Sequence, residues 1–168
     1  PQASLRWPGE TDVLQVALIG CGYWGIRYVA TLGRIEGVRL GWICNRRPVV
    51  LDGRFPPGCR YVDDYRRILD DAATAAVIIA TPPASHHAIA RAALEAGKDV
   101  LVEKPMTCRS AEAMDLCELA AERAQILMVG HTFLYNSAVV ELKRRIDAGQ
   151  LGDLRYLLSR RLGMGPVR

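Results

Sequence analysis

The chain has 168 residues, a formal net charge of +4, and a composition that is 50% hydrophobic and 24% charged. This length suits one domain with a sizeable core, and the composition is ordinary for a globular protein. No apolar run reaches the ~18 residues of a membrane span, and no charged-then-apolar leader opens the chain. We therefore expect a cytoplasmic protein with no membrane partner.

Basic residues occur in short groups along the whole chain and have no aromatic residues between them. This pattern predicts solvated faces and helix ends rather than a nucleic-acid groove. The five cysteines are odd in number and lack C-x-x-C spacing. We interpret them as reduced structural thiols, and we expect neither disulfides nor a metal site.

A glycine-rich loop follows the first predicted strand. The apolar run Leu14–Ile19 is typical of a buried strand in a parallel sheet. A helix is expected from Trp24 to about Ile35. Between them stands a G-x-G-x-x-G sequence that runs from Gly20 to Gly25.

This motif allows a tight turn, close approach of a pyrophosphate to bare backbone, and close packing of helix on strand. The first helical N–H groups also favour negative charge at the same end. Glycine-rich turns serve plain strand-to-helix connections too, but the second predicted strand, Val38–Cys44, ends about 20 residues after the loop, where a ribose-reading residue is expected. We therefore predict dinucleotide binding by Gly20, Gly22, Tyr23, Trp24 and Gly25.

The residue at the ribose-reading position is Asn45, which is followed by Arg46 and Arg47. An acidic residue there would accept hydrogen bonds from the ribose 2′-OH and repel a 2′-phosphate. Asparagine can bond the hydroxyl without that repulsion, and an arginine fork can hold a phosphate. We expect NADP to be preferred over NAD, with Arg46 as the main contact. The alternative is that both arginines point to solvent.

Strands and helices are expected to alternate along the rest of the chain. Further strands are predicted near residues 60–62, 76–80, 99–103 and 126–130, and helices at 64–70, 85–96, 110–123 and 137–148. Ser110 is expected to cap the third of these helices, and Asp63-Asp64 and Asp70-Asp71 to be a cap and a solvated end of the first. The alternation specifies an α/β fold with a doubly wound parallel sheet, the Rossmann arrangement.

This dinucleotide-binding domain is expected to cover residues 13–150. Residues 1–12 contain two prolines, a glycine and no apolar period, which predicts a flexible arm. Residues 154–162 are typical of a strand, but a strand without partners is not stable alone. We interpret residues 151–168 as the opening of a second, α+β domain that continues beyond the chain.

Three clusters of candidate binding or catalytic residues are expected at the carboxyl ends of strands, where ligands bind in open α/β sheets. They are Thr81-Pro82-Pro83 with His86, Glu103-Lys104-Pro105, and residues 130–136. The last of these, with His131 and Tyr135, borders the nicotinamide or substrate in one interpretation. In the other it is a packing loop in which Asn136 caps a helix.

The glycine loop, Ala80-Thr81-Pro82 with His86, the run Gly97 to Pro105, and the turn Gly149-Gln150-Leu151-Gly152 occur in the order found in a known family. The pattern resembles the N-terminal domain of the Gfo/Idh/MocA oxidoreductases, the glucose–fructose oxidoreductase and inositol dehydrogenase family. Glu-Lys-Pro is its most specific element. The resemblance implies a substrate domain beyond Arg168 that is rich in β-structure, carries further catalytic residues and forms a homo-oligomer.

The resemblance assigns Lys104 to catalysis. Its charge would stabilise the developing alkoxide of a substrate hydroxyl that loses its hydride, and so assist proton transfer. Glu103 orients Lys104, bonds the cofactor or forms a plain ion pair, and Pro105 can carry a cis bond. Thr81 and Pro82 are expected beside the cofactor. His86 either joins them or caps a helix next to Ser85.

We therefore expect a cofactor-binding part of an NAD(P)-dependent oxidoreductase that moves a hydride between nicotinamide and a CH–OH or carbonyl carbon of a sugar. The tail 161–168, with residues 20–25 and 130–136, looks most like the branch that acts on nucleotide-linked sugars at C3. The alternative is a module that binds or senses NAD(P) without catalysis. Neither interpretation includes a nucleic-acid partner.

Overall fold

The computed structural model describes residues 13–47, 56–160 and 162 of the chain. These residues fall into two compact units, one that ends at Gly130 and one that starts at His131, and each is described by itself. The predicted arm at 1–12 and most of the tail at 161–168 lie outside the described residues. No helix among the described residues is long and apolar enough to cross a membrane.

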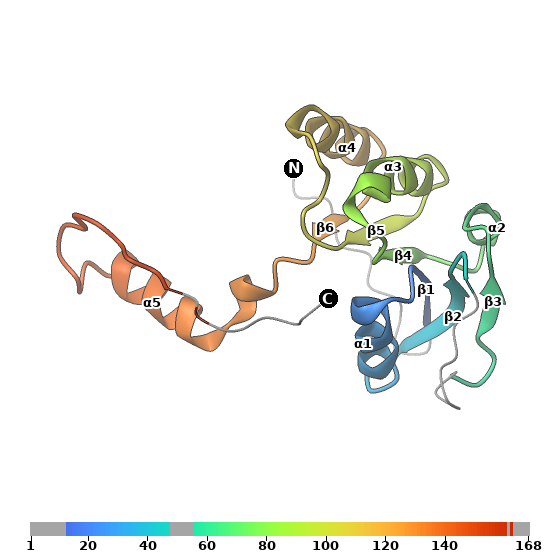
Figure 1. The fold of residues 1–168 in the computed structure, drawn as a ribbon, viewed down its shortest axis with the longest axis horizontal. Coiled ribbons are helices and arrows are strands. Elements are labelled where there is room, and N and C mark those ends of the chain that lie inside the picture. Colours follow the sequence, from blue (N-terminus) through green and yellow to red (C-terminus); the bar gives the residue numbers. More distant parts are fainter. Residues whose placement is uncertain (1–12, 48–55, 161, 163–168) are drawn as a thin grey trace. The chain divides into compact units, whose positions relative to one another are not determined.

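The first unit contains a six-stranded sheet in the order β3-β2-β1-β4-β5-β6, with every neighbouring pair parallel (Figure 1). The strands are β1 Leu14–Ile19, β2 Val38–Cys44, β3 Arg60–Val62, β4 Ala76–Ile79, β5 Asp99–Val102 and β6 Leu127–Val129. The order reverses between β1 and β4, so a crevice at their carboxyl ends is the place where such sheets bind ligands. The predicted doubly wound fold is confirmed.

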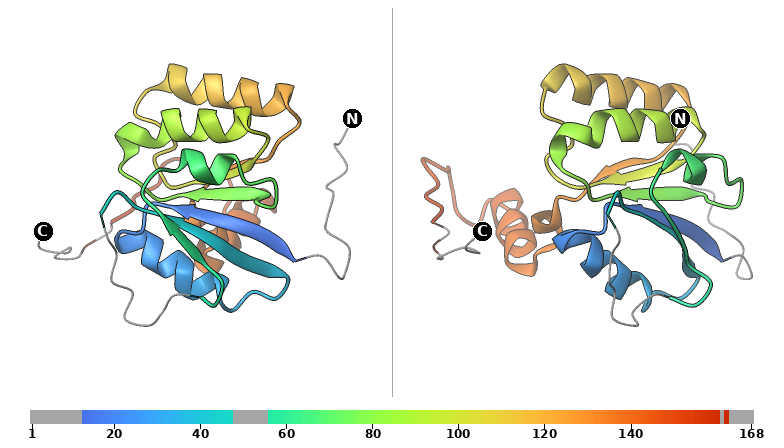
Figure 2. Two further views of the ribbon diagram at one scale, coloured as in Figure 1. Left: turned by 90° about the vertical axis from the view of Figure 1, so that its right-hand side faces the viewer. Right: turned by 45° about the vertical axis from the view of Figure 1, so that its right-hand side comes forward.

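Helices cover both faces of this sheet (Figure 2). On one face lies α1 Tyr23–Leu32, and on the other lie α2 Arg66–Leu69, α3 His86–Glu95 and α4 Ser110–Glu122. A 3₁₀ turn, η1 Pro83–Ser85, leads into α3. The bounds agree with the expected ranges to within three residues, which is the usual uncertainty of helix ends.

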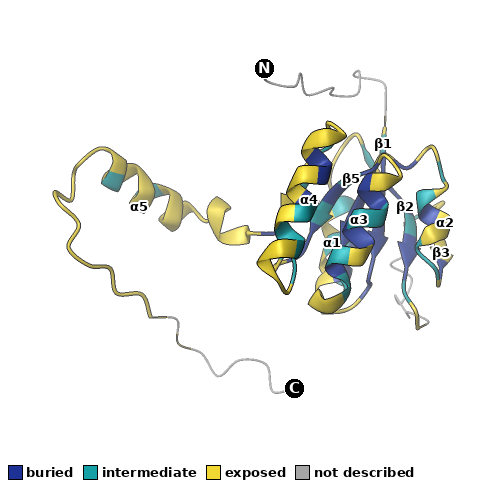
Figure 3. Ribbon diagram, turned by 90° about the horizontal axis from the view of Figure 1, so that it is seen from above, coloured by how far each residue is buried: buried dark blue, intermediate teal, exposed yellow. Residues whose placement is uncertain are grey.

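Each face of the sheet has its own apolar core, because central strands of a parallel sheet are buried on both sides (Figure 3). Under α2, α3 and α4 the core includes Ile79, Leu94 and Leu116, and under α1 it includes Leu18 and Ile43. The strands therefore show the near-continuous apolar sequence from which they were predicted.

The second unit contains η2 Thr132–Tyr135 and α5 Ser137–Asp147. Asn136 caps α5, because its Oδ1 accepts the N–H groups of Ala138 at 3.1 Å and Val139 at 3.3 Å. The capping role of Asn136 is thus confirmed. Residues 154–160, which were expected to belong to a strand, form none in this structure.

Two of the predicted helix ends were wrong. Ser110 is the first helical residue of α4 and not its cap, since Arg109 precedes it and no side chain caps that end. Asp71 is not a solvated helix end. It is half-buried and joins a hydrogen-bonded network. Asp64 accepts the N–H of Arg66 at 3.0 Å, but the residue at the cap position of α2 is Tyr65.

The Asp71 network closes the edge of the sheet opposite the carboxyl ends. One carboxylate oxygen, Oδ2, accepts from Trp42 Nε1 at 2.6 Å, Gln15 Nε2 at 2.9 Å and Thr74 Oγ1 at 2.9 Å. Lys98 Nζ donates to the main-chain oxygen of Asp71 at 2.8 Å. The Trp42 hydrogen bond is the main reason that the pKa of Asp71 lies below its ordinary value.

We predict that Asp71→Asn lowers the free energy of unfolding by about 1–3 kcal/mol near neutral pH, because it weakens several bonds to a half-buried carboxylate. The lowered pKa means that the Asp71 contribution is complete above the ordinary aspartate pKa of about 3.9 and is lost as the pH falls below it. Urea unfolding as a function of pH measures both effects. Asp70→Asn, at the exposed neighbouring carboxylate, is the control, and equal stabilities for the two variants would contradict the prediction.

Candidate functional site

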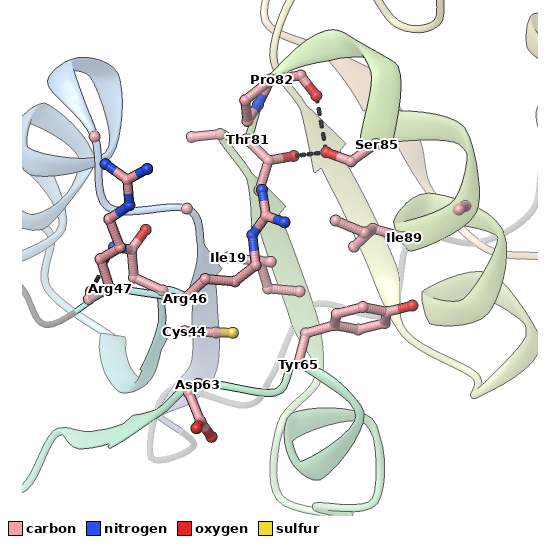
Figure 4. Close-up of a pocket in the computed structure, with 15 residues that line it drawn as sticks. Ile19, Cys44, Arg46, Arg47, Asp63, Tyr65, Thr81, Pro82, Ser85 and Ile89 are labelled. Carbon is pink, nitrogen blue, oxygen red and sulfur yellow. Dashed lines mark hydrogen bonds between the residues drawn. The ribbon is translucent and has the colours of Figure 1, made fainter.

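A cavity of about 560 Å³ opens at the carboxyl ends of β1, β2 and β4 (Figure 4). Its walls come from the glycine loop, the ends of β2 and β3, and the turn between β4 and α3. It is lined by Ile19, Gly20, Gly22, Cys44, Asn45, Arg46, Arg47, Asp63, Tyr65, Ala80, Thr81, Pro82, Ser85, Ala88 and Ile89. Six of the predicted cofactor residues are thus brought together: Gly20, Gly22, Asn45, Arg46, Thr81 and Pro82.

The three glycines of the loop differ in what surrounds them. A Cβ on Gly20, whose φ is +94°, would lie 2.7 Å from the main chain of Ala80, and one on Gly25 would lie 2.2 Å from the Gly20 oxygen. A Cβ on Gly22 would meet no protein atom within 4 Å. Protein packing therefore requires the first and third glycines, and the second leaves open space in the cavity wall.

The amino end of α1 faces this loop and has no side-chain cap at Gly22. The first N–H groups of a helix have no partner within it, so this end is suited to an anion such as a pyrophosphate. Tyr23 and Trp24 are exposed and do not line the cavity, and the Arg27 guanidinium lies over both rings. Gly25 is buried where α1 packs on the loop.

The end of β2 is fixed by Asn45 and Tyr61. Asn45 Oδ1 accepts the Cys21 N–H at 3.2 Å, and its Nδ2 donates to the Arg47 oxygen at 2.7 Å. Tyr61 Oη donates to the main-chain oxygens of Asn45 at 2.5 Å and Arg47 at 2.8 Å. Both arginines are exposed at the cavity wall (Figure 4), and within the described residues neither guanidinium has a carboxylate partner. The amide of Asn45 therefore holds the loop that presents Arg46.

The cavity lining also includes residues that the sequence did not indicate as site residues. Asp63 follows β3 and Tyr65 precedes α2, and both line the cavity with Ile89 of α3 (Figure 4). A motif search misses them because no fixed spacing connects them to the glycine loop. Ser85 Oγ makes 2.8 Å contacts to Thr81 Oγ1 and the Pro82 oxygen, which fixes the turn after β4.

Glu103, Lys104 and Pro105 follow β5, the neighbour of β4, and do not line the cavity. Glu103 is 7% exposed, and its Oε2 accepts the Lys104 N–H at 3.2 Å. The Lys104 side chain is exposed, and the Lys104–Pro105 bond is cis, as suggested from the family resemblance. Glu103 was expected to orient Lys104, to bond the cofactor or to form an ion pair. The hydrogen bond to the Lys104 N–H is a contact of the first kind.

Tyr28 is a further residue that the sequence did not single out. Its Oη, three residues after the last glycine of the loop, donates to Glu103 Oε1 at 2.7 Å. Burial, and then the bond to Glu103 and its charge, raises the pKa of Tyr28 above its ordinary value. The phenol therefore stays protonated and acts as a donor.

His86 is the first residue of α3 and is completely buried. Its Nδ1 lies 2.9 Å from the Pro105 oxygen and its Nε2 lies 2.8 Å from the Thr81 oxygen. Both ring nitrogens therefore face main-chain carbonyls, and His86 does not line the cavity. The residue at the cap position of α3 is Ser85 and not His86, and contact of His86 with a cofactor stays a prediction.

The cysteines differ in burial, and Cys108 and Cys117 are exposed. All five are free, and Cys21 and Cys44 are buried. Burial is the main cause that raises the pKa of Cys44 to about 11. Among the described residues no group of three or more His, Cys, Asp or Glu side chains is arranged to hold a metal ion.

The residues of the cavity fit a dinucleotide. Gly22 leaves room for a pyrophosphate against bare backbone, the α1 amino end suits its charge, and Arg46 stands where a ribose or its phosphate would lie. Apolar side chains such as Ile19 and Ile89 supply walls for a flat ring.

Comparison with known proteins agrees with this geometry. Residues 14–131, more than half of the chain, match the family model described as an oxidoreductase family with an NAD-binding Rossmann fold. The dTDP-3,4-didehydro-2,6-dideoxy-alpha-D-glucose 3-reductase of Streptomyces violaceoruber is 40% identical over 100 residues, which cover 60% of this chain and 29% of that protein. Inositol 2-dehydrogenase of Mycolicibacterium smegmatis is 36% identical over 146 residues, 83% of this chain and 42% of that protein.

Among solved structures, myo-inositol 2-dehydrogenase from Lactobacillus plantarum superposes with a TM-score of 0.76 at 25% identity, over 84% of this chain and 43% of that one. The chain thus spans less than half the length of these relatives. The family match, the glycine loop and the strand order agree, and the chain belongs to the Gfo/Idh/MocA oxidoreductase family and carries its NAD-binding Rossmann fold.

Proposed function

We propose that the chain is the cofactor-binding part of an NAD(P)-dependent oxidoreductase that transfers a hydride between nicotinamide and a CH–OH or carbonyl carbon of a sugar or polyol. The observation that supports this most is the contrast within the glycine loop. Gly20 and Gly25 are glycines because protein atoms leave no room for a Cβ, whereas Gly22 faces open space. No protein atom requires a glycine at this second position, and the open space there suits a bound pyrophosphate.

In this proposal the cofactor, when bound, supplies or accepts the hydride. Gly22 and the amino end of α1 hold its pyrophosphate, and Arg46 holds the ribose end. Lys104 donates a hydrogen bond to the substrate oxygen and stabilises negative charge that develops there. Its exposed side chain and its position at the carboxyl edge of the sheet support that role.

The substrate class rests on the relatives. One is named for inositol and another for a dTDP-linked deoxysugar, and both substrates carry several neighbouring hydroxyl or carbonyl carbons. We propose a substrate of the same kind, with nucleotide-linked sugars as the narrower choice. A turnover screen of the full-length protein with sugar nucleotides, polyols and both cofactors tests this, and no turnover with any of them would contradict it.

We predict that Gly22→Val abolishes cofactor binding and leaves the fold intact. Its side chain would fill the space that the pyrophosphate needs, and its Cβ would meet no protein atom within 4 Å. The shift in melting temperature that NADP or NAD causes is the measurement. Gly33→Ala, at the other end of α1, is the control and should keep the shift. An undiminished shift in Gly22→Val would remove the loop from the proposed site.

Cofactor preference gives a second prediction. A charge-assisted bond from Arg46 to a 2′-phosphate, about 1.5–3 kcal/mol, corresponds to roughly 10- to 150-fold tighter binding of NADP than of NAD. Titration of both cofactors into the wild type and Arg46→Ala measures it, and the variant should lose most of the preference. Asp63→Asn should have the opposite effect and raise the affinity for NADP, because the Asp63 carboxylate lines the same cavity and repels a phosphate.

Equal or tighter binding of NAD by the wild type would contradict the preference for NADP. An unchanged ratio in Arg46→Ala would show that Arg46 does not carry it.

We predict further that Lys104→Ala in the full-length protein lowers kcat by ~10² to 10⁴ and changes cofactor affinity little, because the lysine acts mainly in the transition state. Steady-state kinetics with the substrate found in the screen measures this. Lys143→Ala, at an exposed lysine paired with Asp147 on α5, is the control. A kcat near that of the wild type would make Lys104 a structural residue.

A further inference from the structure

Lys104 lies between two residues that are each held by a different helix. Glu103, on its amino side, is bonded to Tyr28 of α1, and Pro105, on its carboxyl side, is bonded to His86 of α3. Because α1 and α3 cover opposite faces of the sheet (Figure 2), the turn is held from both faces.

On the α1 side the connection runs through a single carboxylate. Tyr28 Oη donates to one oxygen of Glu103 at 2.7 Å, and the other oxygen accepts the Lys104 N–H at 3.2 Å. Glu103 is 7% exposed, so its charge depends on these donors. Gly130 supports the arrangement, since a Cβ there would lie 3.2 Å from Glu103 Oε1.

On the α3 side the imidazole of His86 joins two turns. It lies at hydrogen-bond distance from the oxygen of Pro105 and from the oxygen of Thr81 in the cavity wall. The nearby carboxylate of Asp115 on α4 is bonded to His87 and Arg91 instead. The imidazole of His86 therefore lies between the Lys104 turn and the cavity wall.

We propose that Tyr28 is a positioning residue for Lys104, acting through Glu103, and that His86 supports the same turn from the other face. The inference rests on the proposed role of Lys104. A side chain as long as lysine reaches a defined point only if its backbone is fixed, and small displacements of a reacting group are costly to rate. The same contact connects the helix that would bind the pyrophosphate to the turn that carries the proposed catalytic group.

The sharpest variant is Tyr28→Phe, which removes the hydroxyl and keeps the ring that fills the half-buried site. In the full-length protein kcat should fall roughly tenfold with the KM for cofactor little changed, and the melting temperature should fall modestly because a buried oxygen of Glu103 loses its donor. Thr31→Val removes an exposed hydroxyl from the same helix and is the matched control. Kinetics of Tyr28→Phe indistinguishable from those of Thr31→Val would overturn the proposal.

A double-mutant cycle separates positioning from plain packing. If Tyr28 acts through Glu103, Tyr28→Phe should cost much less in kcat when Glu103 is already Ala, which removes the acceptor of the Tyr28 hydroxyl. Additive losses would show that the hydroxyl acts independently of Glu103 and would also overturn the proposal.

Hydrogen exchange of the Lys104 amide, followed by NMR, tests the contact without turnover. That amide donates to Glu103, so its exchange should accelerate in Tyr28→Phe and stay unchanged in Thr31→Val. Faster exchange in a protein that turns over no sugar would support the contact and refute the proposed function. Unchanged exchange would refute the contact whatever the activity.

Discussion

The structure depends on one close backbone approach at the crossing of β1, β4 and α1. Gly20 lies against the main chain of Ala80, and Gly25 lies against the oxygen of Gly20. A side chain at either position would separate the helix from the sheet or β1 from the turn after β4. This contact brings the amino end of α1 to the point where the strand order reverses, and the cavity forms there.

The two edges of the sheet have different tasks. At the amino edge, Asp71, Gln15 and Trp42 belong to a network in which one carboxylate oxygen of Asp71 accepts three hydrogen bonds. None of these three residues lines the cavity of the proposed site. At the carboxyl edge, polar groups are also hydrogen-bonded, but their bonds hold turns: Asn45 holds the Arg46 loop and Glu103 holds Lys104. The first edge stabilises the fold, and the second fixes the groups that would meet a cofactor and substrate.

Much of this architecture was predictable from the sequence, because the signals are local. The strand at Arg60–Val62, the helix that begins after Asn136 and the glycine loop each follow from a few consecutive residues. The family resemblance rests on motifs of the same kind and is confirmed by the match over residues 14–131. Asn45, Arg46, Thr81 and Pro82 line one cavity because parallel strands end at the same edge.

What the sequence did not predict depends on contacts between distant residues. Tyr28 and Glu103 are 75 positions apart. The helix pattern alone therefore predicts a partly buried aromatic residue at 28 but not its hydrogen-bond partner. Asp71 was interpreted as a solvated helix end, because nothing near it in sequence shows that Trp42 and Gln15 point at it. His86 was expected either beside the cofactor or as a helix cap, and neither expectation includes the carbonyls that its ring nitrogens face, on turns 5 and 19 residues away.

The central claim is that a dinucleotide binds at the carboxyl edge against the open face of Gly22. Hydrogen–deuterium exchange of the full-length protein, with and without saturating NADP or NAD, tests it most directly. We expect slower exchange in peptides that cover residues 19–26, 44–47 and 80–86, and no change in those that cover Asp71 and Thr74 at the opposite edge. Unchanged exchange at the carboxyl edge, or protection at the Asp71 edge instead, would contradict it.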